Sequence, residues 1–318
     1  MVKCKICSNE FENDVSLHRH LRSHKTLVVD YYHAYFPRKD LHTGDLIKFK
    51  NKHQYFSEDF NSRPTMRKWF ESASPAKTKK YCHEYLSKRI KEKGITYTPC
   101  EVEVRSLMCP PVPFLHKSFG NYYDYCSNEL KLKNKYTKYP EEITDLPKNV
   151  NPDSLTVKMY DIYVDTREQK PLKFNFRTQV QTLKYGDYCF SNSKMSANTY
   201  IERKSITDFI GTMSGGYERF KREVERAAED DARLVVLVEE NLANCLNFKF
   251  LPYVSKKIKA TPEFIFHNVR ELAQSYDNLH FLFVKGRLEA SRVTEKLFLH
   301  GGRYTKIDLQ LAYDLRKL

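Results

Sequence analysis

The sequence lacks the long apolar runs that mark membrane and secreted proteins. None of its 318 residues lie in a window approaching the roughly 20 apolar residues of a membrane span. The first residues, MVKCKICSNEF, lack the apolar core of a secretory signal. Eight cysteines are too few for a disulfide scaffold in a chain of this length, and no internal repeat stands out. We therefore expect an intracellular protein without a membrane partner, in a prokaryotic or phage-infected cell or in a eukaryotic nucleus.

Acidic residues are also too few to balance the basic ones. The formal net charge is +14 and the sequence pI is about 9.2, so the surface attracts polyanions, of which nucleic acid is the commonest. Ribosome-associated, heparin-binding and membrane-surface proteins share this bias. A hydrophobic content of 41% with 14% aromatic residues excludes a disordered chain and suffices for two or three domains with their own cores.

The N-terminus carries cysteines and histidines at a metal-binding spacing. The stretch CKICSNEFENDVSLHRHLRSH fits C-x2-C-x12-H-x3-H. Two thiolates on a hairpin and two imidazoles one helical turn apart can converge on a tetrahedral Zn²⁺, which so short a segment needs because it has almost no core. The predicted zinc ligands are Cys4, Cys7, His20 and His24.

This segment resembles the C2H2 zinc-finger family, because Phe11 and Leu17 occupy the two apolar positions of its small core. The resemblance places the DNA-reading helix positions −1, 3 and 6 at Asn13, Ser16 and Arg19. One finger reads only about 3 base pairs, and many single fingers bind proteins or only pack locally. The finger is therefore a DNA reader or a structural module.

Residues 27–135 are basic, aromatic and irregular. Short apolar runs in 31–56 predict small strands and loops, and CPPVP at 109–113 predicts a stiff extended connector. Residues 74–94 predict a helix with Tyr81 and Leu86 on its apolar face. The opposite face carries Lys79 and Lys80, which suit contacts to DNA phosphates or simply a solvated surface. The polar, proline-punctuated residues 136–155 read as a linker.

The last part of the chain, residues 156–318, alternates between strand and helix patterns. Strands are predicted in 157–168, 172–176, 179–190, 199–204, 233–240 and 279–285, and helices in 205–213, 217–231, 262–276 and 289–300. The first strands would begin an antiparallel or mixed sheet. Strands flanked by helices predict a three-layer α/β domain. The apolar positions of 262–276 can form a dimer face or simply core.

Acidic residues stand at the ends of several of these strands. Asp165 closes the first strand, Asp187 follows Gly186, and Glu202 lies two residues before Lys204. Carboxylates gathered at one sheet edge repel one another unless a hard cation lies between them, and oxygen ligands favour Mg²⁺ or Mn²⁺. Such an ion can polarise a phosphodiester and activate a water, while an ammonium stabilises the developing charge.

Four ordered motifs in this domain resemble the XPF-type nuclease domain of the PD-(D/E)xK superfamily. They are VDTRE (164–168), GDY (186–188), IERKSITDF (201–209) and GGYERFKRE (215–223). The resemblance implies a restriction-endonuclease-like fold and Mg²⁺-dependent DNA cleavage, with Asp165, Asp187 and Glu202 near the metal and Lys204 at the water or phosphate. The supporting active-site residues would be Arg167, Glu168 and Asp208, and the phosphate contacts or orienting partners Arg203 and Arg219. Taken singly, Asp165 with Arg167 can be an exposed turn pair, Asp208 a helix cap and Arg219 part of a charged helix face.

These observations predict a DNA endonuclease with a finger at 1–26, a basic DNA-binding domain at 27–135, a linker at 136–155 and a nuclease domain at 156–318. Residues after 300 leave no room for the tandem helix-hairpin-helix module of many XPF-type proteins, so preference for branched DNA cannot be carried over. A separate reader joined to a cutter favours site-directed cleavage, as in homing endonucleases. Structure-specific cleavage of branched DNA and a non-catalytic DNA-binding protein are the alternatives. Cutting both strands would need a second copy, such as a homodimer through the nuclease domain, or a second event.

Overall fold

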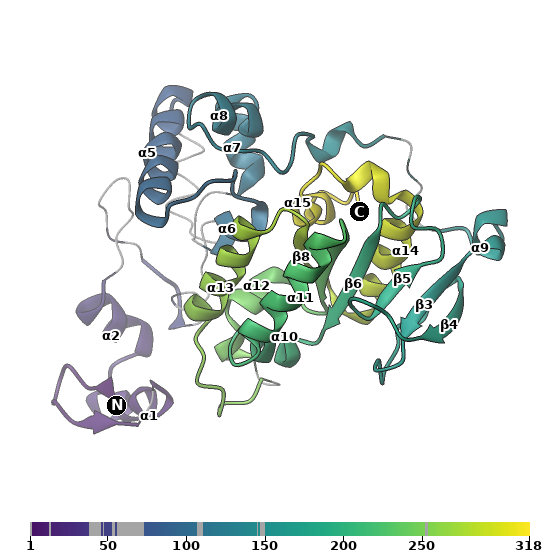
Figure 1. Ribbon diagram of the computed structural model, residues 1–318. Helices are drawn as coiled ribbons and strands as arrows, with labels where there is room; N and C mark the ends of the chain where they lie inside the picture. Colours follow the sequence, from purple (N-terminus) through teal and green to yellow (C-terminus); the bar gives the residue numbers. More distant parts are fainter. Residues whose placement is uncertain are drawn as a thin grey trace. The chain divides into compact units, whose positions relative to one another are not determined.

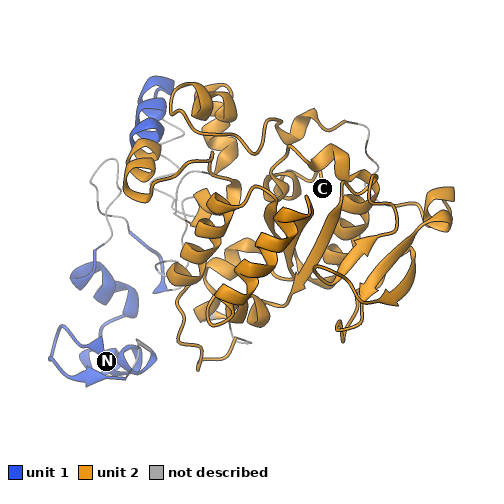
Figure 2. Ribbon diagram, viewed as in Figure 1, with its two compact units in different colours: residues 1–84 blue, residues 85–318 orange. Residues whose placement is uncertain are grey.

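The computed structural model describes most of the chain. It covers residues 2–12, 14–37, 46, 48–52, 55, 73–106, 111–144, 146, 150–251 and 254–318. These divide into two compact units, Met1–Glu84 and Tyr85–Leu318 (Figure 2). Among the described residues, every helix is too short or too polar to cross a bilayer.

The first unit begins with a short hairpin packed on a helix. Strands β1 (Val2–Lys3) and β2 (Glu10–Phe11) pair antiparallel, and α1 (Asp14–His20) continues into the 3-10 helix η1 (Leu21–His24) (Figure 1). Leu17 is buried, and Phe11 packs against the same core, as the zinc-finger resemblance implies. This unit also contains α2 (Val28–Tyr35).

Helix α2 corrects the expectation of strands and loops from residue 31. It buries Val29, Tyr31 and Tyr32 against the core that contains Leu17. Aromatic residues favour strands in isolation, but here tertiary packing on one helical face decides the local structure. The predicted lysine-rich helix is confirmed as α5 (Pro75–Lys93), with Tyr81 and Leu86 buried.

The second unit is built on a six-stranded mixed sheet in the order β4-β3-β5-β6-β7-β8. β5 runs antiparallel to both β3 and β6, whereas β4 is parallel to β3, and β6, β7 and β8 are mutually parallel. The strands are β3 (Asp161–Asp165), β4 (Arg177–Gln181), β5 (Tyr188–Phe190), β6 (Thr199–Lys204), β7 (Arg233–Val238) and β8 (Leu279–Phe283).

Helices cover both faces of this sheet, which confirms the three-layer prediction. Alternate residues of β8 mark the two faces, because Leu282 joins the core beneath α14 while the ring of Phe283 contacts the rings of Phe209 in α10 and Phe266 in α13. Figure 1 shows α10, α11 and α13 as one group in front of the sheet. The bounds are α10 (Ile206–Thr212), α11 (Tyr217–Glu229), α12 (Leu242–Leu246), η3 (Phe248–Phe250), α13 (Pro262–Ser275), α14 (Gly286–Tyr304) and α15 (Leu309–Asp314).

One predicted strand is wrong. Residues 172–176 are irregular, and β4 begins only at Arg177. Leu172 and Phe176 nevertheless reach the core, whereas every residue of β4 is exposed at the sheet edge. The apolar pattern therefore predicted the burial of these side chains correctly, but they belong to a loop and not to a strand.

The segment before the sheet also packs into the second unit. It contains α6 (Glu101–Ser106), α7 (Val112–Phe119), α8 (Tyr122–Asn128), η2 (Pro140–Glu142) and α9 (Leu155–Met159). Gln274 of α13 accepts a hydrogen bond from the Tyr97 amide at 2.9 Å, and Asp308 accepts one from the Glu101 amide at 2.6 Å. The extended connector predicted at 109–113 is wrong at its end, since Val112 begins α7, and residues 109 and 110 lie outside the described part. The predicted domain boundaries stay predictions.

Candidate active site

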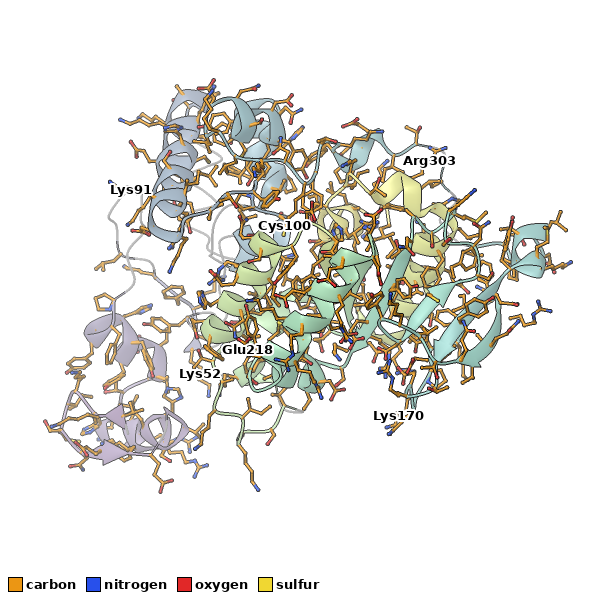
Figure 3. All side chains as sticks on the ribbon, viewed as in Figure 1. Lys52, Lys91, Cys100, Lys170, Glu218 and Arg303 are labelled. Atoms are coloured by element: carbon orange, nitrogen blue, oxygen red, sulfur yellow. The ribbon has the colours of Figure 1, made fainter. Side chains whose placement is uncertain are left out.

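A cleft of about 330 Å³ opens at the ends of β3 and β6 in the second unit. Six of its lining residues were predicted from the sequence, and two, Gln169 and Lys170, were not. Figure 3 labels Lys170 on the loop that follows β3. The full lining is Arg167, Glu168, Gln169, Lys170, Asp187, Arg203, Lys204 and Asp208.

The alternation of β6 sorts its three charged residues onto two faces. Glu202 and Lys204 are two residues apart and therefore share a face, whereas Arg203 points to the other. The Lys204 ammonium donates to Glu202 Oε1 in a largely buried ion pair. Glu202 is 8% exposed and lies behind the cleft lining, next to Lys204.

Gly186 brings Asp187 against β6. Its φ is +58°, and a Cβ built on it would lie 2.7 Å from the Ile201 carbonyl oxygen, so the position requires glycine. This close approach lets the Asp187 amide donate to the Ile201 carbonyl at 2.8 Å. Asp187 Oδ2 in turn accepts a hydrogen bond from the Arg203 amide at 2.7 Å. The motif GDY therefore fixes the Asp187 carboxylate beside Glu202.

Burial and neighbouring negative charges destabilise the charged forms of these two carboxyls. Burial, reinforced by the charge of Glu202, raises the pKa of Asp187 to about 7. Burial likewise raises the pKa of Glu202, with Lys204 opposing the shift and the Glu223 charge adding to it. For Lys204, burial favours the neutral amine, but the charges of Glu202 and Asp187 outweigh it and raise its pKa. The site therefore concentrates negative charge that one ammonium only partly neutralises.

Asp165 is held apart from that pair. Its Oδ1 accepts from the Arg167 amide and Nε at 2.9 and 2.6 Å, and its Oδ2 accepts from Arg167 Nη2 and the Leu183 amide at 3.1 and 2.8 Å. Burial favours the acid form, but these hydrogen bonds outweigh it and lower the pKa of Asp165. Within the described part of the chain, Asp165, Asp187 and Glu202 do not come within 4.8 Å of one another as a three-ligand group.

Arg203 belongs to a chain of alternating charges that is buried at its centre and ends at the exposed Arg287. Its Nε and Nη2 donate to both oxygens of Glu168 at 2.9 and 3.1 Å, and its Nη1 donates to Glu239 at 3.1 Å. Arg287 at the start of α14 extends the chain by donating to Glu239 at 3.2 Å. The side chains of Arg203 and Glu168 are only 13% and 5% exposed. Arg203 is thus placed to orient the cleft wall.

The structure leaves open both roles that the sequence allowed for Asp208 and for Arg219, a structural role and a role in the active site. Ser205 caps α10, since its hydroxyl accepts from the Asp208 amide at 3.2 Å and donates to Asp208 Oδ2 at 2.7 Å. Asp208 therefore stabilises the helix start and also lines the cleft. Arg219 is exposed on α11, where it can meet solvent or a ligand.

Glu223 is the acidic residue of this neighbourhood that the sequence analysis missed. It lies on α11 one turn after Arg219, between the buried residues Phe220 and Val224. Its Oε1 accepts a hydrogen bond from the Gly186 amide at 3.3 Å. The sequence did contain a signal for Glu223. It is an acidic residue between core positions, on a helix that follows the ERK motif. Glu239 and Arg287 gave none, because their pairing joins distant strand and helix ends.

The first unit gathers the four predicted zinc ligands. Their ligand atoms all lie within 4.8 Å of one another. The Sγ–Nε2 distances are 3.7 Å for Cys4 with His24 and 3.1 Å for Cys7 with His20. A tetrahedral Zn²⁺ would place a sulfur and a nitrogen ligand about 3.5–3.6 Å apart, a value between the two observed distances, so the four side chains suit this ion.

The predicted DNA-contacting residues of the first unit are on its surface where they are described. Arg19 is exposed on α1, Ser16 is half-buried, and Asn13 lies outside the described residues. Lys79 and Lys80 are exposed on α5, and Lys80 faces Glu84 at 3.9 Å. Figure 3 labels Lys91 on the same helix, in the other unit.

The second unit thus combines a three-layer α/β fold with Asp187, Glu202 and Lys204 gathered beside the end of β6, as the sequence predicted for a nuclease. Residues 164–297 form an ERCC4 domain, which confirms the predicted XPF-type resemblance and contains the residues from Asp165 to Asp208.

Two solved structures of XPF from Aeropyrum pernix are similar to this chain. The complex with DNA is 21% identical with a TM-score of 0.33, and the match covers 43% of this chain and 62% of that one. The second structure is 18% identical with a TM-score of 0.34, covering 49% and 69%. A comparison with curated proteins gives no match.

Proposed function

We propose that the chain is a metal-dependent DNA endonuclease that hydrolyses phosphodiester bonds at the cleft beside β6. The observation that carries the proposal is the close set of Asp187, Glu202 and Lys204 inside an ERCC4 domain. The strongly basic composition supports a polyanionic substrate. An inactive relative would be expected to lose a carboxylate or the lysine, and all three are present.

The donor set of the cleft fits a hard divalent cation. Asp187 and Glu202 offer only oxygen atoms, which Mg²⁺ and Mn²⁺ prefer, and burial makes their charged forms unfavourable without a cation. A bound Mg²⁺ or Mn²⁺ supplies Lewis acidity, which polarises the phosphodiester and lowers the pKa of a water. Asp165 would join as the predicted third ligand only by releasing Arg167.

The chain's own residues divide the remaining work. Lys204 holds its proton and places a positive charge beside the reacting phosphate, where charge develops in the transition state. Arg167, with 70% of its side chain exposed, can contact the DNA backbone, either held by Asp165 as in this structure or released if Asp165 joins the metal. The ion pair between Arg203 and Glu168 stabilises the wall of the cleft that these two residues form.

The first unit would direct this cutter to its target. Zn²⁺ on Cys4, Cys7, His20 and His24 would hold α1 in a form that can read base edges, and the lysines of α5 would contact phosphates. We therefore propose site-directed cleavage by an intracellular enzyme. Structure-specific cleavage is the second candidate, which the ERCC4 match favours. A homodimer would supply the second active site for a double-strand break.

Plasmid nicking tests the catalytic proposal. We expect the wild type to nick supercoiled DNA with Mg²⁺ and to stop in EDTA, and Glu202→Gln to bind DNA without nicking. Glu218→Gln is the matched control, because Glu218 is an exposed glutamate on α11 and should leave nicking unchanged. Nicking by Glu202→Gln at the wild-type rate would refute the assignment.

Mapping cut ends on a random DNA library tests the targeting proposal. Cys4→Ser should keep metal-dependent nicking while its cut sites broaden or weaken. Identical cut maps for this variant and the wild type would rule out a reader role for the finger. Preferential cutting of flapped or forked substrates by both proteins would favour the structure-specific candidate.

A further inference from the structure

A second cavity of about 540 Å³ lies at the other end of the central strands. Arg233 and its neighbour Thr199 begin β7 and β6, whereas Lys204 ends β6 at the active site. Five residues of strand separate the two ends by roughly 16 Å. The cavity is therefore distinct from the cleft, and all its lining residues belong to the second unit.

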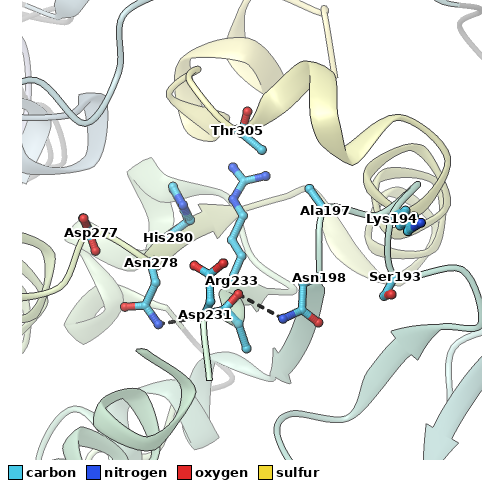
Figure 4. A pocket seen from close by; sticks show the side chains of 11 residues that line it. Ser193, Lys194, Ala197, Asn198, Asp231, Arg233, Asp277, Asn278, His280 and Thr305 are labelled. Carbon is cyan, nitrogen blue, oxygen red and sulfur yellow. Dashed lines mark hydrogen bonds between the residues drawn. The ribbon is translucent and has the colours of Figure 1, made fainter. Parts of the chain in front are cut away.

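Arg233 lines this cavity with a guanidinium that the fold leaves largely unpaired. Figure 4 shows its side chain reaching up between His280 and Ala197 toward Thr305. The residue is 7% exposed, and Nη2 donates to the Tyr304 carbonyl at 2.9 Å. Its Nε and Nη1 are buried and have no hydrogen-bond partner among the described residues. Burial lowers the pKa of Arg233 to about 10, and no carboxylate of the described residues compensates for this shift.

Such a buried, unpaired cation is unfavourable unless something pairs with it. Buried arginines ordinarily meet carboxylates or phosphates through two parallel hydrogen bonds, and removing that partner is strongly destabilising. Neighbouring His280 accepts or donates a hydrogen bond with Tyr136 at 3.2 Å, and burial together with the Arg233 charge holds its pKa well below the usual range. His280 is therefore neutral near pH 7 and adds no competing charge.

The rest of the cavity favours a small ligand over a DNA backbone. Asn278 Oδ1 is buried without a partner among the described residues, so it can accept a hydrogen bond from a protonated phosphate or a hydroxyl. Exposed Asp231 and Asp277 also line the cavity and oppose the approach of a polyanion, and exposed Lys194 offsets only one of them. A volume of about 540 Å³ is in the range of small-molecule sites.

We propose that this cavity is a binding site for a small molecule with a phosphate or carboxylate head, which Arg233 would pair with at its base. The head would accept hydrogen bonds from Arg233 Nε and Nη1. The neutral or cationic remainder would face the acidic rim formed by Asp231 and Asp277. This proposal goes beyond the nuclease function and does not depend on it.

Titration calorimetry of the full chain without Mg²⁺ or DNA tests it, with inorganic phosphate, acetate and deoxyadenosine monophosphate as probes. We expect at least one probe to bind, and phosphate against acetate decides which head group is preferred. Arg233→Met should weaken that binding at least tenfold. No binding of any probe up to about 50 mM, or undiminished binding by Arg233→Met, would overturn the proposal.

Two further variants guard against a folding defect. Asn278→Asp keeps the side-chain shape but adds negative charge to the wall, so it too should weaken anion binding at least tenfold. Arg177→Met removes an exposed arginine of the same unit, which is paired with Asp161, and should bind like the wild type. Loss of binding in Arg177→Met would point to surface charge and refute the cavity. Competition by a 12-nucleotide single strand would also refute it, by assigning the anion site to DNA.

Discussion

Replacing Asp187 by asparagine should stabilise the metal-free protein while abolishing cleavage. The structure holds this carboxyl in a half-buried position beside Glu202, where its charged form is unfavourable. Asparagine has the same shape, and its oxygen can still accept the hydrogen bond from the Arg203 amide. The variant therefore removes the unfavourable charge without removing the contact that positions the residue.

The magnitude follows from the shift in pKa. The pKa of Asp187 rises from 3.8 to about 7, and each unit corresponds to about 1.36 kcal/mol, which sets a ceiling of about 4 kcal/mol above pH 7. The amide also loses the attraction of Lys204 and gains two donors that need partners, so roughly 1–3 kcal/mol should remain. In a unit of this size that is a rise in Tm of roughly 2–12 °C.

The sign of the pH dependence is fixed by the same shift. The folded pKa exceeds the unfolded one, so the folded state binds more protons between about pH 4 and pH 7. The wild-type free energy of unfolding should fall across that window relative to the variant, and the two proteins should converge near pH 4. Urea unfolding in magnesium-free buffer at several pH values measures the difference. Asp153→Asn, an exposed carboxyl in the same unit, should show none. An Asp187→Asn protein less stable than wild type at pH 8, or a gap independent of pH, would refute the reasoning.

Three other outcomes follow from the structure. Gly186→Ala should lower the free energy of unfolding in urea by roughly 1–3 kcal/mol more than Gly120→Ala does. Both positions have positive φ, but only at Gly186 would the added Cβ also meet a backbone oxygen. Equal losses of stability in the two variants would contradict the close approach. Arg287→Met should lower the nicking rate about tenfold and leave DNA affinity unchanged. Leu288→Met, at the exposed neighbouring position, should match the wild type. A loss of DNA affinity without a loss of rate would contradict the role of Arg287 in holding the cleft wall. Metal analysis should find about one zinc per wild-type chain and none in Cys7→Ser, and equal zinc content would exclude the predicted ligand set.

The sequence predicted the parts of this site that are local in the chain. Asp187 could be found because a glycine with positive φ must precede it, and Glu202 with Lys204 because their spacing of two places both on one strand face. Metal ligands four residues apart on a helix, such as His20 and His24, are equally local.

The parts that the sequence did not predict depend on contacts between distant segments. The hydrogen bond from the Leu183 amide to Asp165 joins residues 18 positions apart in the sequence. No helical or strand periodicity predicts such a contact. The core role of Leu172 and Phe176 without a strand, and the helical state of Tyr31, are set by burial against other elements. The sequence did not predict the role of Arg233 for a similar reason, because no local pattern distinguishes a buried arginine at the first position of a strand from an exposed one.

Arg287 has a consequence for how the cleft receives a substrate. Besides its contact with Glu239, it donates to the backbone carbonyls of Lys170 and Pro171 at 2.8 and 3.0 Å, and so ties the loop after β3 to the start of α14. One wall of the cleft is thus preorganised, and incoming DNA need not spend ordering entropy on it. Association at this wall should therefore be limited by desolvation of charged groups more than by loop closure.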